Sequence, residues 1–169
     1  IASKQGDIVC HIASDNEQGG RLIGEYLAKA IGGKGQIAII DYPQATSVQD
    51  RVRGFEGALA RHPEIKIVAK QPGGGVRDQA ATTMENLLQA HPNLTAVFGI
   101  NDNSALGAIS VLQARGRKDI AVVGFDADPE GREAIRKGFL LADAIQYPVK
   151  MGATTISTVV RHLQGQAVP

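Results

Sequence analysis

Three polar residues follow apolar runs of the sequence, a position where ligand-binding side chains are expected in α/β proteins. Asp126 follows IAVVGF, Asn101 follows TAVFGI and Gln146 follows LADAI. A carboxylate at the end of a buried strand is costly unless something pairs with it. Arg51 lies in the first turns of the helical segment after another apolar run, QIAII. If the runs are parallel strands, all four side chains gather at one edge of a sheet.

The residue types at this edge favour a ligand covered in hydroxyl groups. Asn and Gln both donate and accept hydrogen bonds, Asp accepts with two oxygens, and Arg donates in a rigid fork. A phosphate fits less well, because Asp126 would repel it. The alternative is that such residues cap helices and stabilise turns. We favour that alternative for Asp15 and Asp102, and the ligand-binding role for Asn101, Asp126 and Gln146.

The sequence shows no clear motif for catalysis, phosphate binding or metal binding. Ser47 and Ser104 lack the setting of a nucleophile elbow, and the glycines at 73–75 lack the spacing of a phosphate-binding loop. Asp126 and Asp128 lie two residues apart on a loop, which fixes no carboxylate separation. The four histidines show no metal-ligand spacing. We therefore expect no catalytic residue, no metal and no cofactor.

Composition limits the partners further. The net charge of +1 argues against an electrostatic footprint for nucleic acid. No apolar run is long enough to span a membrane, so no membrane insertion is expected.

Cys10, the single cysteine, lies in the apolar run IVCHI, and we expect it to be a buried core residue. The sequence opens at Ile1 and ends at AVP, so we expect a fragment or a processed chain.

Apolar runs and helical periodicity alternate along the chain. Strands are predicted at 8–12, 36–40, 65–69, 95–100, 120–125 and 141–145, and helices at 21–31, 52–62, 79–90, 104–114 and 152–163. Asp15, Ser47 and Asn101 or Asp102 are candidate helix caps. Apolar strands that alternate with helices predict an α/β fold, with a doubly wound parallel sheet covered by helices on both faces. Ligands of such sheets bind outside the carboxyl ends of the strands.

Five segments together resemble the periplasmic sugar-binding proteins of the ribose-binding type. They are HIASDNEQGG, DRVRGF, FGINDNSALGA, VVGFDADPEG and AIQYP, and they follow one another in family order. Members of this family have two Rossmann-like lobes with a sugar held between them. The resemblance implies that residues 12–145 form the carboxy-terminal lobe. Residues 1–11 and 147–169 would then belong to the other lobe.

The resemblance also implies which residues contact the sugar. Arg51, Asn101, Asp126 and Gln146 match the family's sugar-binding positions in this lobe. Ribose-type relatives carry an aromatic ring in the loop after the strand predicted at 65–69, where this chain has Gly75. Tyr42, after the strand predicted at 36–40, is a candidate to supply a ring instead.

The family implies a periplasmic, non-catalytic solute-binding protein for a sugar or polyol. Its partner would be the permease of an ABC transporter, and in some members also a chemoreceptor. Two alternatives stay open. The effector-binding domain of a lac-repressor-like regulator predicts an amino-terminal helix-turn-helix on the full gene product, whereas the transport role predicts a signal peptide. A sugar-acting α/β enzyme predicts turnover.

Overall fold

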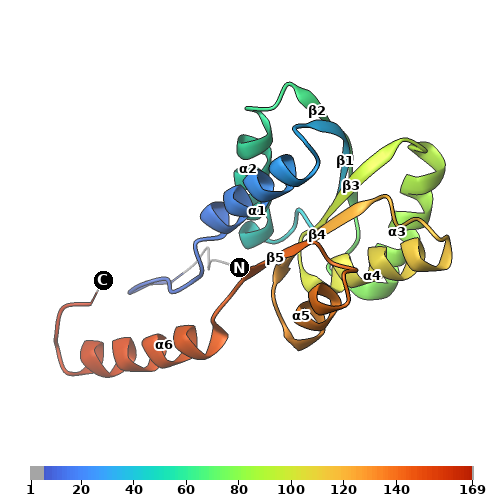
Figure 1. Ribbon diagram of the computed structural model, residues 1–169. Coiled ribbons are helices and arrows are strands. Elements are labelled where there is room, and N and C mark those ends of the chain that lie inside the picture. The colour runs from blue at the N-terminus through green and yellow to red at the C-terminus, as the bar shows by residue number, and fades with distance from the viewer. Residues whose placement is uncertain (1–5, 169) are drawn as a thin grey trace.

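A computed structural model describes residues 6–168 and shows a parallel sheet with helices on both faces (Figure 1). The strands are β1 (Lys34–Asp41), β2 (Glu64–Pro72), β3 (Leu94–Gly99), β4 (Ala121–Asp126) and β5 (Ala142–Ile145). The helices are α1 (Asn16–Ala30), α2 (Thr46–Leu59), α3 (Arg77–Ala90), α4 (Asp102–Ala114), α5 (Pro129–Arg136) and α6 (Pro148–Leu163). The sheet order is β2-β1-β3-β4-β5, and every pair is parallel. The predicted α/β class is confirmed.

Alternate residues of the central strands pack against different helix layers. In β1, Ile37 and Ile39 pack with α1 and α2, whereas Ala38 and Ile40 pack with α3 and α4. This alternation follows from the two-residue period of a strand. Because both faces of β1 are buried, its residues form the continuous apolar run that the sequence shows. The sheet is thereby held rigidly between two layers, and its carboxyl edge is a fixed platform.

Two sequence predictions of secondary structure were wrong. Residues 8–12 form no strand in the described part of the chain, and Cys10 is half-buried rather than part of a core. The apolar run there has no neighbouring strand to pair with, and periodicity alone could not reveal that. Helix α5 was not predicted, because its eight residues give a short and mostly polar pattern. Pro129 at its start and Asp128 as its cap were the available signals.

Helix caps also differ from the prediction at two positions. Asp15 caps α1 and Asn101 caps α4, each through its side-chain oxygen. Ser47, by contrast, lies inside α2, whose N-cap is Ala45 without a side-chain hydrogen bond. Asp102 is the first residue of α4 rather than its cap.

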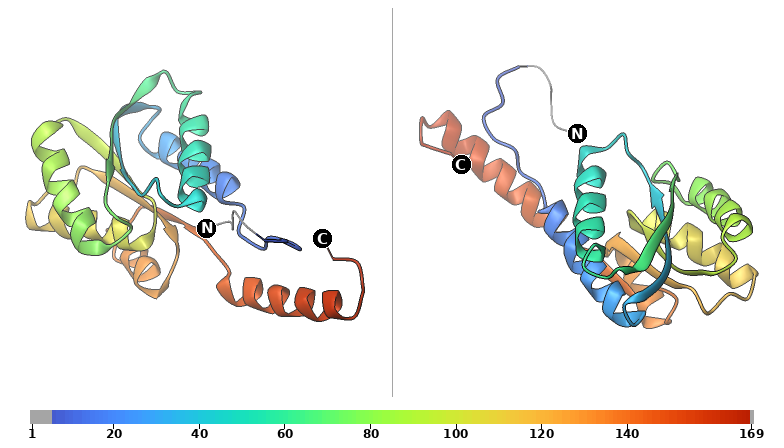
Figure 2. Two further views of the ribbon diagram at one scale, coloured as in Figure 1. Left: turned by 180° about the vertical axis from the view of Figure 1, so that it is seen from behind. Right: turned by 90° about the horizontal axis from the view of Figure 1, so that it is seen from above.

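Helix α6 extends away from the sheet, and the chain before α1 runs along the same side (Figure 2). Thr158 is the one buried residue of α6, while Val149 and Leu163 are 86% and 79% exposed. Ser14 Oγ lies 3.6 Å from Met151 Sδ, which links the two segments near their exit from the sheet. None of the described helices is long and apolar enough to cross a membrane.

Candidate functional site

The carboxyl edge of the sheet brings three of the four predicted ligand-binding residues into one network. Asp126 ends β4, Gln146 follows β5, and Arg51 reaches the edge from α2. Arg51 Nη1 lies 3.1 Å from Asp126 Oδ1. Gln146 Nε2 donates to the same oxygen at 2.6 Å. The side chains therefore converge as parallel strands require.

Asp126 keeps one oxygen toward solvent. Its side chain is 35% exposed, and the hydrogen bonds found within residues 6–168 use Oδ1. Burial raises the pKa of Asp126, while the guanidinium of Arg51 acts in the opposite direction. Oδ2 is left as a hydrogen-bond acceptor in a fixed position. Such an oxygen suits a hydroxyl donor from a ligand.

Arg51 is almost fully buried and is held on several sides. Its Nε donates to Asn16 Oδ1 at 2.9 Å, and its Nη1 donates to the Ile100 carbonyl at 2.7 Å. Its Cζ lies 3.9 Å from the centre of the Phe125 ring. Burial lowers the pKa of Arg51, and Asp126 opposes that change. The fork is thereby pre-oriented, with its charge balanced by Asp126.

Asn101 lies at the same edge but outside that network. Its Oδ1 accepts from the Ser104 backbone at 2.9 Å and its Nδ2 donates to the Gly75 carbonyl at 3.0 Å. Asn101 thus caps α4 and ties the loop after β2 to the end of β3. The capping role and a contact with a ligand are compatible, because the side chain is only half-buried.

Gly75 and Tyr42 lie beside each other. A Cβ placed on Gly75 would lie 3.7 Å from Tyr42 Cδ1, and Gly75 has a φ of +69°, which disfavours other residues. Tyr42 is exposed, at 37%. Tyr42, directly after β1, thus places an exposed ring beside Gly75. Asn16 and Phe125 complete the surroundings of Arg51, although neither was among the predicted ligand-binding residues. Asn16 is the first residue of α1, four residues after the apolar run at 8–12.

The backbone at Asp126 is strained, which independently marks this position. Asp126 and the following Ala127 have φ values of +115° and +53°, and neither is glycine. Such conformations cost about 1–3 kcal/mol each and cluster at functional sites.

Among the residues that the structure describes, no group of three or more His, Cys, Asp or Glu side chains could hold a metal ion.

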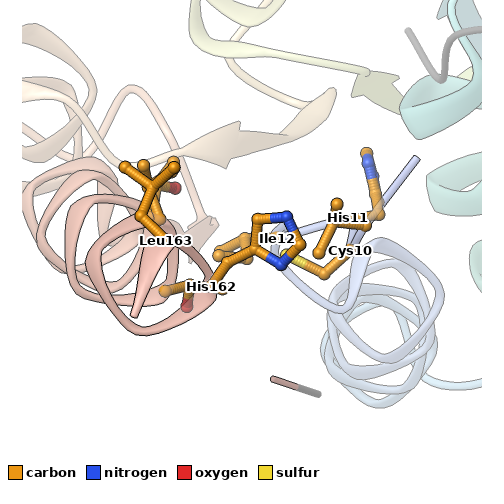
Figure 3. A pocket seen from close by; sticks show the side chains of 9 residues that line it. Cys10, His11, Ile12, His162 and Leu163 are labelled. Carbon is orange, nitrogen blue, oxygen red and sulfur yellow. The ribbon is translucent and has the colours of Figure 1, made fainter. Parts of the chain in front are cut away.

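A different hollow lies between residues 9–12 and α6, away from the sheet edge (Figure 3). Its lining is mostly apolar and includes Val9, Ile12, Val159 and Leu163, together with His11 and His162. None of the described residues that line it has a carboxylate or amide side chain. Polyhydroxylated ligands need such groups, so the candidate site remains the carboxyl edge of the sheet.

Comparison with known proteins decides the family. The periplasmic binding protein domain matches residues 2–167. The chain belongs to this periplasmic binding protein family. The ribose import binding protein RbsB of Escherichia coli is 40% identical over 165 residues, which are 97% of this chain and 55% of the relative. The chain thus spans about half the length of the curated relatives that it matches.

Solved structures of the family share the fold of this chain over nearly its whole length. A glucose-galactose binding protein from Geobacillus stearothermophilus superposes with a TM-score of 0.94 at 32% identity, over 99% of this chain and 61% of that protein. A solute-binding protein of an ABC transporter from Actinobacillus succinogenes, solved with bound D-allose, gives a TM-score of 0.90 at 34% identity. It is covered over 56% of its length, by 94% of this chain. The predicted type of fold, a Rossmann-like lobe of the periplasmic binding proteins, is confirmed.

Proposed function

We propose that this chain supplies one side of the sugar site of a solute-binding protein that serves an ABC importer. The observation that carries the proposal is the network at the carboxyl edge, in which Arg51 and Gln146 hold Oδ1 of Asp126, while Oδ2 makes no hydrogen bond with any residue that the structure describes. The relatives named above support it. They are a ribose import binding protein, a glucose-galactose binding protein and a solute-binding protein of an ABC transporter that was solved with D-allose. The ligand class is a sugar or polyol. We propose that the location is the periplasm, that the permease is the partner, and that no catalysis takes place.

The ligand-binding residues that we propose are Arg51, Asn101, Asp126 and Gln146. Tyr42 is proposed to lie against the sugar, in the space that Gly75 leaves open. Their donor and acceptor groups face one side of a ligand only. Pockets that bind small molecules tightly bury most of the ligand surface, so a second lobe is needed to cover the opposite side.

We also propose a division of the chain between two lobes. Residues 12–145 form the carboxy-terminal lobe, which contains the whole sheet and α1 to α5. Residues 1–11 and 147–169 belong to the amino-terminal lobe, and residues 1–5 and 169 of these lie outside the described part. The exposure of Val149, Ile156 and Leu163 on α6 supports this division, because such an apolar surface normally packs against another unit.

The test is a thermal-shift screen of the full-length protein against sugars and polyols, including D-ribose, D-allose, D-galactose and D-fructose. A sugar present at about 100 times its Kd is expected to raise the free energy of unfolding by about 2.7 kcal/mol. We expect another sugar to surpass D-ribose, because Gly75 offers no ring face. The sugar-binding function would be contradicted if no sugar or polyol shifted the midpoint, and D-ribose as the best ligand would contradict the inference from Gly75.

Replacing Tyr42 by alanine is expected to weaken binding of the best sugar from this screen by about two- to tenfold. Aromatic contacts contribute about 0.5–1.5 kcal/mol beyond buried area. Calorimetric titration measures the change. Tyr26→Ala is the matched control, because Tyr26 is an exposed tyrosine on α1 outside the proposed site. Equal affinities of the parent and Tyr42→Ala would remove Tyr42 from the site.

A further inference from the structure

Two buried carboxyl groups beneath the candidate site have no role in the network described above. Asp102 begins α4 and is 2% exposed, and Asp143 lies in β5. Asp102 Oδ1 and both carboxyl oxygens of Asp143 are inaccessible and lack a hydrogen-bond partner among the described residues. Leaving such groups unpaired in a core is costly. This pair therefore requires an explanation.

The two carboxyl groups lie under the first turn of α5. A Cβ placed on Gly131 would lie 2.5 Å from Asp102 Oδ1 and 2.7 Å from Asp143 Oδ2, so only glycine fits there. Two ionised carboxylates accept hydrogen bonds and donate none. They can satisfy each other only if one carries a proton, as in carboxyl pairs that share a site.

Burial is the main reason why Asp143, rather than Asp102, is the better holder of that proton. Burial, and then Asp102, raise the pKa of Asp143 to about 9. Burial also raises the pKa of Asp102, but a proton donated by Asp143 and the hydrogen bond from the Asp128 backbone act against that change. The other charged groups that face the pair are Asp126 on β4, Asp128 at the start of α5 and Arg51 on α2. With the proton on Asp143, Asp143 is the hydrogen-bond donor of the pair and Asp102 is the carboxylate that faces it.

Asp102 uses its other oxygen to hold the strained turn after β4. Asp102 Oδ2 accepts from the Asp128 backbone N–H at 2.7 Å. The two residues before Asp128 are Asp126 and Ala127, both at positive φ. Arg132 Nε adds a bond to the Ala127 carbonyl at 2.7 Å. A strained turn persists only when its surroundings hold it in place, and Asp102 is one of these supports.

We propose that Asp102 and protonated Asp143 form a positioning pair that holds the turn at 126–128, and so aims Asp126 at the sugar. The inference rests on the proposed sugar-binding function. The pair touches no ligand; it acts through the turn. Loss of the proton leaves two carboxylates facing each other in a buried space. Their repulsion displaces Asp102 and weakens its hydrogen bond with the Asp128 N–H.

The pair also makes stability depend on pH with a definite sign. The pKa of Asp143 is higher in the folded state than its ordinary value of 3.8. Between these two values the folded state binds the extra proton, so the contribution of Asp143 to the free energy of unfolding falls as pH rises from about 4 to about 9. Asp143→Asn keeps an N–H donor toward Asp102 and removes the titration. At pH 8.5 the midpoint of thermal unfolding of this variant is expected to lie above that of the parent. This difference between variant and parent is expected to be several degrees larger at pH 8.5 than at pH 4.5.

The experiment has one part without sugar and one part with D-allose, both on the full-length protein. In the first, NMR follows the Asp143 carboxyl carbon and the Asp128 amide from pH 5 to pH 10. Both are expected to shift with one midpoint near the pKa of Asp143, and the Asp128 shift is expected to vanish in Asp143→Asn. A midpoint of Asp143 below pH 6, or an Asp128 amide that does not follow it, would overturn the proposal.

In the second part, calorimetry measures the affinity for D-allose at pH 7 and pH 9.5. The parent is expected to bind up to about fourfold more weakly at pH 9.5, because about a quarter of the molecules keep the proton there when the midpoint is near 9 and only that form holds the turn for the sugar. Asp143→Asn is expected to lose less than half of that, and Asp143→Leu, which lacks a donor, to bind weakly at both values. An equal loss in the parent and Asp143→Asn would overturn the proposal. If the parent bound neither D-allose nor any other sugar or polyol of the thermal-shift screen, the sugar-binding function would be contradicted instead, and the NMR titration would still decide the positioning pair.

Discussion

Asp126→Asn is expected to weaken sugar binding by the full-length protein by about 10- to 150-fold. The change removes a charged acceptor whose hydrogen bonds are worth about 1.5–3 kcal/mol. It also leaves the buried guanidinium of Arg51, 3.1 Å away, without its counter-charge. Isothermal titration with the best sugar from the thermal-shift screen measures the loss.

Asp119→Asn provides the matched control for this variant. Asp119 lies just before β4, so the control substitution makes the same chemical change near the opposite end of the same strand. It is exposed and pairs with Arg117 rather than with the network. The control is expected to bind like the parent. If Asp126→Asn also kept the parent's affinity, Asp126 would have no part in sugar recognition.

Arg51→Lys is expected to lower both stability and affinity. Lysine keeps the charge but loses the planar fork, and it cannot reach Asn16, the Ile100 carbonyl and Asp126 together. Loss of one hydrogen bond from a buried charged group costs about 1.5–3 kcal/mol. For a protein of this size, that corresponds to a melting temperature lower by about 3–12 °C. Sugar affinity is expected to fall by about tenfold, because Asp126 is no longer held.

The control for Arg51→Lys is Arg53→Lys on the same helix. Arg53 is 58% exposed and pairs with Glu17 and Asp50 at the surface, where ion pairs contribute little. Differential scanning calorimetry and sugar titration of both variants separate the two positions. Equal melting temperatures and affinities of Arg51→Lys and the parent would show that the buried fork is dispensable.

The sheet and its functional edge could be predicted because their causes are local. Buried parallel strands require apolar runs, and polar residues directly after those runs must meet at one edge. That logic selected Asp126 and Gln146, and it placed Arg51 nearby. The structure brings these three into contact, while their contact with a sugar remains a prediction.

Other features depend on packing that the sequence does not reveal. Residues 8–12 have the apolar pattern of a strand, yet no strand within residues 6–168 pairs with them, because pairing depends on distant segments. Asn16 is recognisable as part of the site only once α1 and α2 pack together and its Oδ1 meets Arg51 Nε. Asp102 follows the cap of α4 and was interpreted as a cap itself. Only the tertiary structure shows that it faces Asp143 and holds the turn after β4.

The most direct test of the account is a crystal structure of the full-length protein with the best sugar from the screen. We predict that sugar oxygens lie within about 2.6–3.2 Å of the polar side-chain atoms of Arg51, Asn101, Asp126 and Gln146. We also predict that a second lobe covers the opposite face of the sugar. A sugar bound elsewhere, for example in the apolar hollow between residues 9–12 and α6, with Asp126 facing only water, would contradict the account.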